Sequence, residues 1–212
     1  MTELQIRKQI IATALQMNTL GINRGKSGNV SARLRTGFLV TPSGLPYEET
    51  RPTDIAFIDT KGKSKGPREP SSEWRFHFDI YRNRKEVQAV VHTHSSFATT
   101  LACLGLGVPA FHYMVAVAGG NDIRCAPYAT FGTQALSDHA IAALEHRSAC
   151  LLANHGMIAV STTLVRALAL AVEVETLAEM YWRALQIGAP VVLSDAEMDI
   201  VVAKFRTYGQ QE

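Results

Sequence analysis

The stretch Ala89-Val90-Val91-His92-Thr93-His94 runs from an apolar start to two histidines separated by one residue. The apolar run predicts a strand that leaves a hydrophobic core near its end. Residues i and i+2 of a strand point to the same face, so His92 and His94 should present both imidazoles on one side. That arrangement suits chelation of one ion, because histidine is the commonest metal ligand. The alternative is a pair of polar residues on a solvated strand face.

A third histidine, His155 in Asn154-His155-Gly156, also ends an apolar run. Gly156 permits a close backbone approach at this point. Three neutral imidazoles are enough to hold a zinc-class ion and to leave a coordination position open for chemistry. Taken alone, His155 is also typical of a buried histidine with satisfied hydrogen bonds. The remaining histidines have no comparable placement, and we interpret them as structural: His77, His112, His139 and His146.

Glu73 is the candidate acid or base. It lies in Ser71-Ser72-Glu73, which predicts a helix with a serine cap and an acid in its first turn, running to about Tyr81. An ordinary N-terminal helix acid is the simpler interpretation of this residue. Beside a metal, however, a carboxylate can serve as the fourth ligand or as a proton carrier.

Three turns of small residues can cradle an anion, because each offers backbone N–H groups and short donors. They are Gly28-Asn29, Ser43-Gly44 and Ser71-Ser72. Turns of this kind are common, so each alone is a weak indication. The GxxxxGK(S/T) and GxGxxG spacings of the Walker and Rossmann motifs are absent from the sequence.

Length and composition indicate one globular domain over residues 1–212, with a sizeable core, since 47% of residues are hydrophobic. The net charge of +2 is too small to indicate nucleic-acid binding. The basic cluster between Lys61 and Arg68 resembles solvated charges on a hairpin or loop. The three cysteines form no CxxC pair, and the sequence has no signal-peptide pattern, which predicts a cytoplasmic protein. It also has no apolar run of roughly 20 residues, so we expect no contact with membranes.

Interleaved helical and strand patterns predict a single α/β-type domain, although the topology of its sheet is not readable from them. The expected strands cover 38–40, 55–58 and 89–94, with one or two more in 149–160, interrupted near His155-Gly156. The expected helices cover 4–17 (stopped by Gly21), 71–81, 95–104 and 163–186. A capping box, Ser194 with Glu197, predicts a last helix that ends near Gly209.

Taken in order, these motifs resemble the class II aldolase/adducin family, and within it the bacterial fuculose-phosphate aldolase branch. The matching segments are 25–31, 41–44, 70–75, 89–94, 112–114, 118–121, 126–133, 154–156 and 204–209. They cover nearly the whole chain without large gaps. The resemblance implies a three-layer α/β/α sandwich around a largely antiparallel sheet. It also implies a cyclic homotetramer with active sites at the subunit interfaces.

The resemblance assigns expected roles to the candidate residues. His92, His94 and His155 resemble the ligands of one zinc ion per subunit, and other divalent metals are also possible. Glu73 resembles the residue that completes the metal shell and carries a proton. The expected phosphate pocket consists of Gly28, Asn29, Ser43, Gly44, Ser71 and Ser72. Tyr113 resembles a catalytic tyrosine that reaches the site of a neighbouring subunit. Phe131 and Tyr208 correspond to residues near the aldehyde end of the substrate.

The implied reaction is the reversible cleavage of a small sugar phosphate, L-fuculose 1-phosphate or a related deoxyketose 1-phosphate, including the 5-deoxyribulose and 5-methylthioribulose types. Its products are dihydroxyacetone phosphate and an aldehyde such as lactaldehyde or acetaldehyde. A metal would act as a Lewis acid at the ketose oxygens. The alternatives are a sugar-phosphate dehydratase or decarboxylase on the same fold, and a non-catalytic adducin-like module. A module without chemistry has no need of the three histidines and Glu73.

Two positions depart from the fuculose-type pattern. Lys26 stands where a small hydroxyl residue is usual, and it either contacts the phosphate or points to solvent. Asn154 stands where a histidine is common. Both departures leave the expected metal ligands in place, so they bear on the identity of the sugar more than on the type of reaction.

Overall fold

The computed structural model of the chain describes residues 1–205. Its described part contains one mixed sheet of nine strands in the order β4-β3-β2-β1-β5-β9-β8-β7-β6. The strands are β1 (Asn29–Leu34), β2 (Gly37–Val40), β3 (Ala56–Asp59), β4 (Ser64–Lys65), β5 (Ala89–Thr93), β6 (Val108–Pro109), β7 (Asp122–Ala126), β8 (Ala149–Leu152) and β9 (Gly156–Ser161). Neighbouring strands pair antiparallel, except that β7 and β8 are parallel.

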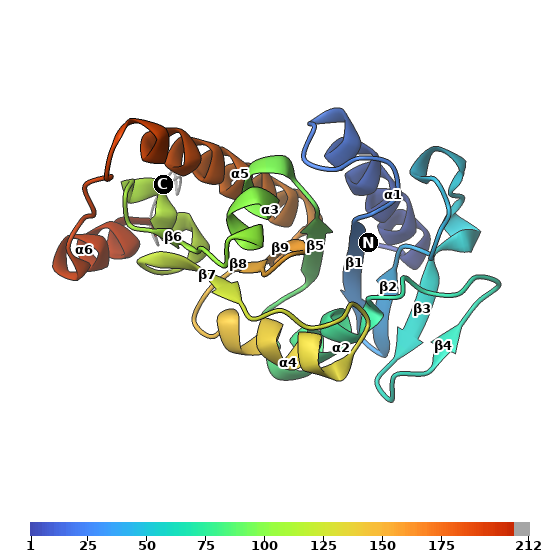
Figure 1. Cartoon of the computed structure of the whole chain (residues 1–212). Helices are drawn as coiled ribbons and strands as arrows, with labels where there is room; N and C mark the ends of the chain where they lie inside the picture. Colours follow the sequence, from blue (N-terminus) through green and yellow to red (C-terminus); the bar gives the residue numbers. More distant parts are fainter. Residues whose placement is uncertain (206–212) are drawn as a thin grey trace.

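Helices cover both faces of this sheet (Figure 1). The helices are α1 (Glu3–Thr19), α2 (Trp74–Asn83), α3 (Ser96–Cys103), α4 (Gln134–Ala143), α5 (Leu164–Ile187) and α6 (Asp195–Phe205), with 3₁₀ turns at Tyr47–Glu49, Pro52–Asp54 and Tyr113–Ala118. Helices α1, α3 and α5 lie on one face, and α2 and α4 lie on the other. This is the three-layer sandwich with a largely antiparallel sheet that the family resemblance implied.

The two central strands are apolar on both faces, which is why a helical layer covers each side. In β5, Val91 packs into the core beneath α1, α3 and α5, whereas Val90 packs into the core beneath α2 and α4. Met157 and Ile158 of β9 divide in the same way. Strands buried on both faces are expected to be continuously hydrophobic. The histidines at the end of β5 and just before β9 therefore stand out against these apolar strands.

Most of the expected elements are confirmed to within a few residues. The sequence left open whether the segment 149–160 forms one strand or two. It forms two strands, β8 and β9. The last helix begins at Asp195, and the N–H of Glu197 donates to the Ser194 hydroxyl at 3.2 Å. Its expected end near Gly209 lies outside the described residues. In the described part of the chain, none of the helices is both long and apolar enough to span a membrane.

The helix expected from Ser71 begins instead at Trp74, and this start was wrong. Glu73 occupies the N-cap position rather than the first turn. The Ser71 carbonyl accepts the Trp74 N–H at 3.0 Å, and the Ser71 hydroxyl accepts the Glu73 N–H at 3.3 Å. A short turn over 71–74 therefore precedes the helix, and it frees the Glu73 side chain to point away from the helix terminus.

Candidate metal centre

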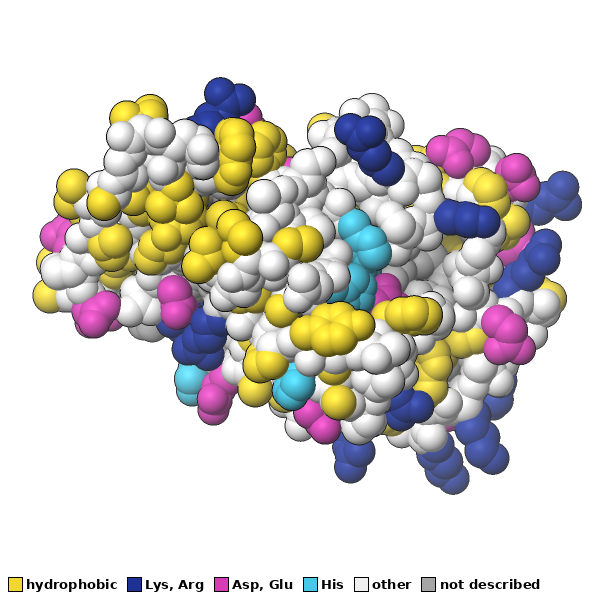
Figure 2. Space-filling model, viewed as in Figure 1, with side chains coloured by type: hydrophobic (Ala, Val, Ile, Leu, Met, Phe, Trp, Pro, Cys, Tyr) yellow, Lys and Arg dark blue, Asp and Glu magenta, His cyan; other side chains and the backbone are white. Residues whose placement is uncertain are grey.

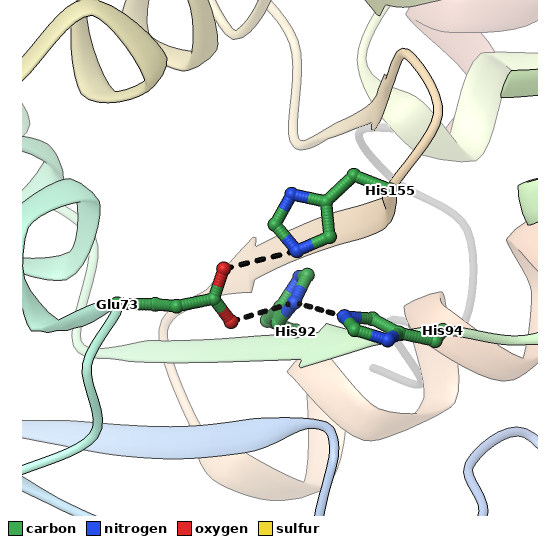
Figure 3. A group of neighbouring side chains, drawn as sticks. All are labelled: Glu73, His92, His94 and His155. Atoms are coloured by element: carbon green, nitrogen blue, oxygen red, sulfur yellow. Dashed lines mark hydrogen bonds and ion pairs between the residues drawn. The ribbon is translucent and has the colours of Figure 1, made fainter. Parts of the chain in front are cut away.

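Glu73, His92, His94 and His155 converge on one point, although they come from three separate segments (Figure 3). Nε2 of His92 lies 3.0 Å from Nε2 of His94 and 3.1 Å from Oε2 of Glu73. Nε2 of His155 lies 2.9 Å from Oε1 of Glu73. One donor atom from each of the four residues lies within 4.8 Å of all the others. The convergence expected for the three histidines is therefore observed.

The strand, the hairpin and the helix each place one part of this cluster. His92 is in β5 and His94 follows directly after it, so both rings emerge on the same face, as the alternation of a strand requires. His155 is in the tight turn between β8 and β9, and β9 pairs with β5. Glu73 reaches the same point from the start of α2, on the other side of the cluster.

The hairpin turn that carries His155 needs special backbone residues. Asn154 has a positive φ of 55°, a conformation that asparagine tolerates better than most residues. A Cβ at Gly156 would lie 2.4 Å from the backbone oxygen of Thr93 and 2.9 Å from the His94 ring. Gly156 is thus required for β9 to approach the end of β5. Asn154 therefore has a backbone role in this turn.

The donor set fits a divalent metal ion. In a tetrahedral site with bonds of about 2.0 Å, ligand atoms lie about 3.3 Å apart, close to the 2.9–3.1 Å separations seen here. The Nδ1–H of His92 donates to the Met157 carbonyl at 2.8 Å, so in the neutral ring the Nε2 lone pair faces the cluster. Oε1 of Glu73 is buried without an aligned hydrogen-bond donor among the described residues. A cation would satisfy this oxygen and the facing lone pairs together.

Protonation in the cluster also favours a cation. Burial opposes ionisation of Glu73, which is only 5% exposed, but interactions with His92 and His155 lower its pKa below the ordinary value. Burial lowers the pKa of the His94 imidazole to about 4, and the neighbouring His92 and His155 act in the same direction. A carboxylate beside a neutral imidazole at pH 7 is the protonation state that metal ligation requires.

A cavity of about 330 Å³ opens above the cluster. It is lined by Ser27, Ser72, Glu73, His94, Tyr128, Ala129, Phe131, Asn154 and His155. Figure 2 shows histidine side chains at the bottom of a hollow near the middle of the face, with hydrophobic side chains along its lower edge. The cavity therefore joins the polar cluster to an apolar rim, on which Phe131 is 63% exposed.

Three lining residues, Ser27, Tyr128 and Ala129, were not singled out from the sequence. Ser27 immediately precedes the Gly28-Asn29 turn, and the other two precede Phe131 by only two or three positions. The sequence indicated these three residues only through their closeness to expected site residues. That closeness does not decide their role, because a loop residue beside a site residue can equally point away from the site.

The turns expected to bind an anion lie next to one another. Backbone hydrogen bonds of 3.0 Å join residues 41–43 to residues 69–71. Nζ of Lys26, beside the first turn, donates to the Gly44 carbonyl of the second at 2.7 Å. Lys26 thus links two of the turns and keeps its charge beside them.

The Gly28-Asn29 turn is packed against the strand that carries the histidines. Asn29 pairs with His92 in the antiparallel register of β1 and β5. A Cβ at Gly28 would lie 2.5 Å from the backbone oxygen of His92, so only glycine allows this approach. The Asn29 side chain is buried, and its Nδ2 donates to Oε2 of Glu73 at 3.0 Å. This turn therefore connects the candidate phosphate pocket directly to the candidate metal centre.

One expected site residue, Tyr113, lies elsewhere in the described part of the chain. Tyr113 opens the 3₁₀ turn Tyr113–Ala118, is 51% exposed, and stacks on Phe205 of α6 with ring centroids 6.4 Å apart. It does not line the cavity of its own chain. Tyr208 lies outside the described residues.

The sequence profile of the Class II Aldolase and Adducin N-terminal domain matches residues 8–182. The chain belongs to the class II aldolase/adducin family. It is 59% identical over 208 residues to the 5-methylthioribulose-1-phosphate/5-deoxyribulose-1-phosphate aldolase of Rhodospirillum rubrum, covering 98% of this chain and 94% of the relative. It is 51% identical over 206 residues to the L-fuculose phosphate aldolase of Escherichia coli K12, covering 97% of this chain and 96% of the relative.

Solved structures agree with this family membership. A structure of L-fuculose 1-phosphate aldolase superposes with a TM-score of 0.93 at 40% identity, covering 95% of this chain and 96% of the other. The two relatives described above are both named as aldolases, and this chain matches them along nearly their whole length. The chain is accordingly a metal-dependent aldolase, and Glu73, His92, His94 and His155 form a group that can hold its metal ion.

Proposed function

We propose that this class II aldolase reversibly cleaves a deoxyketose 1-phosphate to dihydroxyacetone phosphate and an aldehyde. The observation that carries the proposal is the convergence of Glu73, His92, His94 and His155 at the base of a cavity of about 330 Å³. The candidate substrates are 5-methylthioribulose 1-phosphate, 5-deoxyribulose 1-phosphate and L-fuculose 1-phosphate, after the names of the relatives. The first two are favoured, because the relative named for them is the more similar.

Zinc is the proposed metal, because three imidazoles and one carboxylate are typical zinc ligands. His92, His94, His155 and Glu73 would hold one ion per subunit. A bound ion supplies Lewis-acid chemistry, stabilising negative charge on the substrate oxygens beside the bond that breaks.

The proposed proton carriers are Glu73 and Tyr113. Glu73 is a buried carboxylate beside the cavity, so it must first take up a proton, which it would then deliver to the C3 carbon once the C3–C4 bond has broken. Tyr113 would take the proton of the C4 hydroxyl and pass it to solvent, which replaces the proton that Glu73 takes up. Since Tyr113 does not line the cavity of its own chain, it would act in a neighbouring subunit of a homotetramer.

The three adjoining turns are proposed to hold the substrate phosphate. The proposed pocket consists of Gly28, Asn29, Ser43, Gly44, Ser71 and Ser72, and Lys26 adds a positive charge beside Gly44. The N–H groups of Ser43 and Ser71 already donate to the carbonyls of Glu69 and Thr41, so these two residues would contribute their hydroxyls. Holding the phosphate fixes the reacting carbons against the metal centre, which lowers the entropic cost of the reaction. Phe131 on the cavity rim and Tyr208 would contact the aldehyde end.

A coupled assay for dihydroxyacetone phosphate tests the reaction. The purified protein, loaded with zinc, should release dihydroxyacetone phosphate from at least one of the three candidate substrates. A panel of aldehydes in the synthesis direction (lactaldehyde, acetaldehyde, methylthioacetaldehyde and glycolaldehyde) then ranks the preferred aldehyde. Loss of water or carbon dioxide without dihydroxyacetone phosphate would refute the aldolase and favour a dehydratase or decarboxylase.

Elemental analysis tests the metal. One zinc per chain is expected in the unaltered protein, and His155→Ala should reduce both bound zinc and turnover by more than about 100-fold. His139→Ala is the matched control, because His139 bonds to the Pro127 carbonyl away from the cluster. Equal zinc content in the two variants would contradict the proposed ligand set.

A further inference from the structure

A line of buried polar side chains leads from Glu73 away from the cavity. Nδ2 of Asn29 donates to Oε2 of Glu73 at 3.0 Å, and Oδ1 of Asn29 lies 2.5 Å from Nε2 of His77. Nδ1 of His77 lies 2.7 Å from the Ser31 hydroxyl, which lies 2.8 Å from the hydroxyl of Tyr81. The five groups form one continuous chain of hydrogen bonds.

The direction of every bond in this chain follows from its first member. An ionised Glu73 can only accept, so the Asn29 amide must present its nitrogen to Glu73 and its oxygen to His77. His77 must then donate from Nε2, and as a neutral ring it accepts at Nδ1. Ser31 gives its single hydrogen to His77, so Tyr81 donates to Ser31. All the hydrogens therefore point toward Glu73.

Water cannot replace these partners. His77 and Ser31 are 0% exposed, Asn29 is 2% exposed and Tyr81 is 4% exposed. The His77 ring also stacks on Phe76, with centroids 4.6 Å apart. Burial lowers the pKa of His77 to about 3, in agreement with a neutral ring at pH 7.

We propose that His77 is a positioning residue, whose Nε2–H holds the Asn29 amide in the one orientation that donates to Glu73. The proposal rests on the role of Glu73 as proton carrier. An amide has nearly the same shape in both orientations, so packing alone does not select between them. The reversed amide would face the Glu73 carboxylate with its own oxygen. Without the His77 donor, the buried Asn29 oxygen would lack a partner, and leaving a buried polar group unpaired is unfavourable.

A role limited to packing leads to different expectations. His77 would then need only a flat ring to stack on Phe76, and phenylalanine would replace it without consequence. It would also have no preferred tautomer. Phenylalanine and glutamine at position 77 separate these cases, because the first keeps the ring and loses the N–H, whereas the second keeps an N–H donor and loses the ring.

Nuclear magnetic resonance of ¹⁵N-histidine-labelled, metal-free protein at pH 7 is the first test. The His77 ring should be neutral, protonated at Nε2 and unprotonated at Nδ1. A ring protonated at Nδ1 alone, or at both nitrogens, would overturn the proposal. This measurement uses the unaltered protein and no substrate, so it decides the proposal even if His77→Phe fails to fold or the aldolase assay shows no activity.

Kinetics and metal binding provide the second test. His77→Phe should lower kcat for dihydroxyacetone phosphate release and weaken zinc binding, which chelator competition measures. We expect kcat, the zinc affinity or both to fall by about 10- to 100-fold. His77→Gln should recover part of the loss. Unaltered kcat and zinc affinity in folded His77→Phe would overturn the proposal. A lack of dihydroxyacetone phosphate release by the unaltered protein would instead refute the proposed function, and zinc affinity would still report on His77.

Discussion

Glu175, in the middle of α5, accepts a hydrogen bond of 2.8 Å from the backbone N–H of Phe97 in the first turn of α3. Its second carboxylate oxygen accepts the N–H of Ala98 at 2.9 Å. The first N–H groups of a helix have no partner within the helix, and the Ser95 side chain makes no cap here. Glu175 therefore supplies the cap from a neighbouring helix, and it fixes the point at which the chain turns after His94.

We expect Glu175→Ala to lower the free energy of unfolding by about 1–2 kcal/mol, because two part-buried N–H groups lose their acceptor. Urea unfolding of the metal-free protein measures this change. Glu179→Ala on the same helix is the matched control, since Glu179 makes only an exposed pair with Arg183. The control should change stability by no more than about 0.5 kcal/mol. Equal stabilities of the two variants would show that Glu175 does not cap α3.

Glu73→Gln should reduce turnover by about 100- to 10,000-fold, the range expected when a general acid or base is removed. Glutamine keeps the size of the side chain and an oxygen for Asn29, but it carries neither the proton nor the charge. Assays of dihydroxyacetone phosphate release measure the effect, with size-exclusion chromatography to verify that the oligomeric state is unchanged. Glu69→Gln, at an exposed position four residues away, should leave turnover unaltered. Near-normal turnover of Glu73→Gln would show that another group carries the proton.

The strands and the cluster were predictable because their signals are local in the sequence. The apolar runs that end at His94 and surround His155 mark β5, β8 and β9, and the i, i+2 spacing of His92 and His94 fixes their shared face. Gly156 indicated that another segment can approach the backbone closely at this point, and the structure shows that this segment is the end of β5. What the residues alone left undecided was whether the segments meet, because that depends on the order of strands in the sheet.

Helix α4 and the hydrogen bonds of His77 were not predicted, because both depend on buried polar residues. Helix α4 buries Ser137 among its apolar residues, and the Ser137 hydroxyl donates to Asp79 at 2.7 Å. This polar residue interrupts the apolar pattern that would have indicated a helix. His77 had no placement that suggested a role, since its partners Asn29 and Ser31 are 48 and 46 residues away. Hydrogen bonds between distant segments have no periodicity, and only the folded chain reveals them.

His77 also predicts a pH dependence of stability. Its pKa is about 3 in the folded protein, against about 6.5 in an unfolded chain. The unfolded state therefore binds more protons below pH 6.5, so this contribution is complete above that pH and declines as the pH falls toward 3. Unfolding of the metal-free protein should show a weaker decline between pH 6.5 and 4 for His77→Phe than for the unaltered chain. His146→Gln, at an exposed position, should match the unaltered chain, and equal slopes for all three would contradict the assignment.

Subunit mixing tests whether Tyr113 acts in a neighbouring subunit. Glu73→Gln and Tyr113→Phe should each be nearly inactive as pure oligomers, since each site then lacks one proton carrier. If every site combines Glu73 of one subunit with Tyr113 of another, equal co-expression of the two variants restores both groups at about one quarter of the sites. The mixed protein should then recover about one quarter of the unaltered kcat.

If instead each site used both groups from one chain, mixing would restore nothing, because each chain would still lack one of them. The matched control is co-expression of Glu73→Gln with His94→Ala. Both changes disable the same half of the site, so no combination of subunits contains an intact set of Glu73 and His94. Recovery of activity in the first mixture but not in the second shows that each site uses residues of two subunits. If mixing only diluted the effect of a defective subunit, activity would change equally in both mixtures.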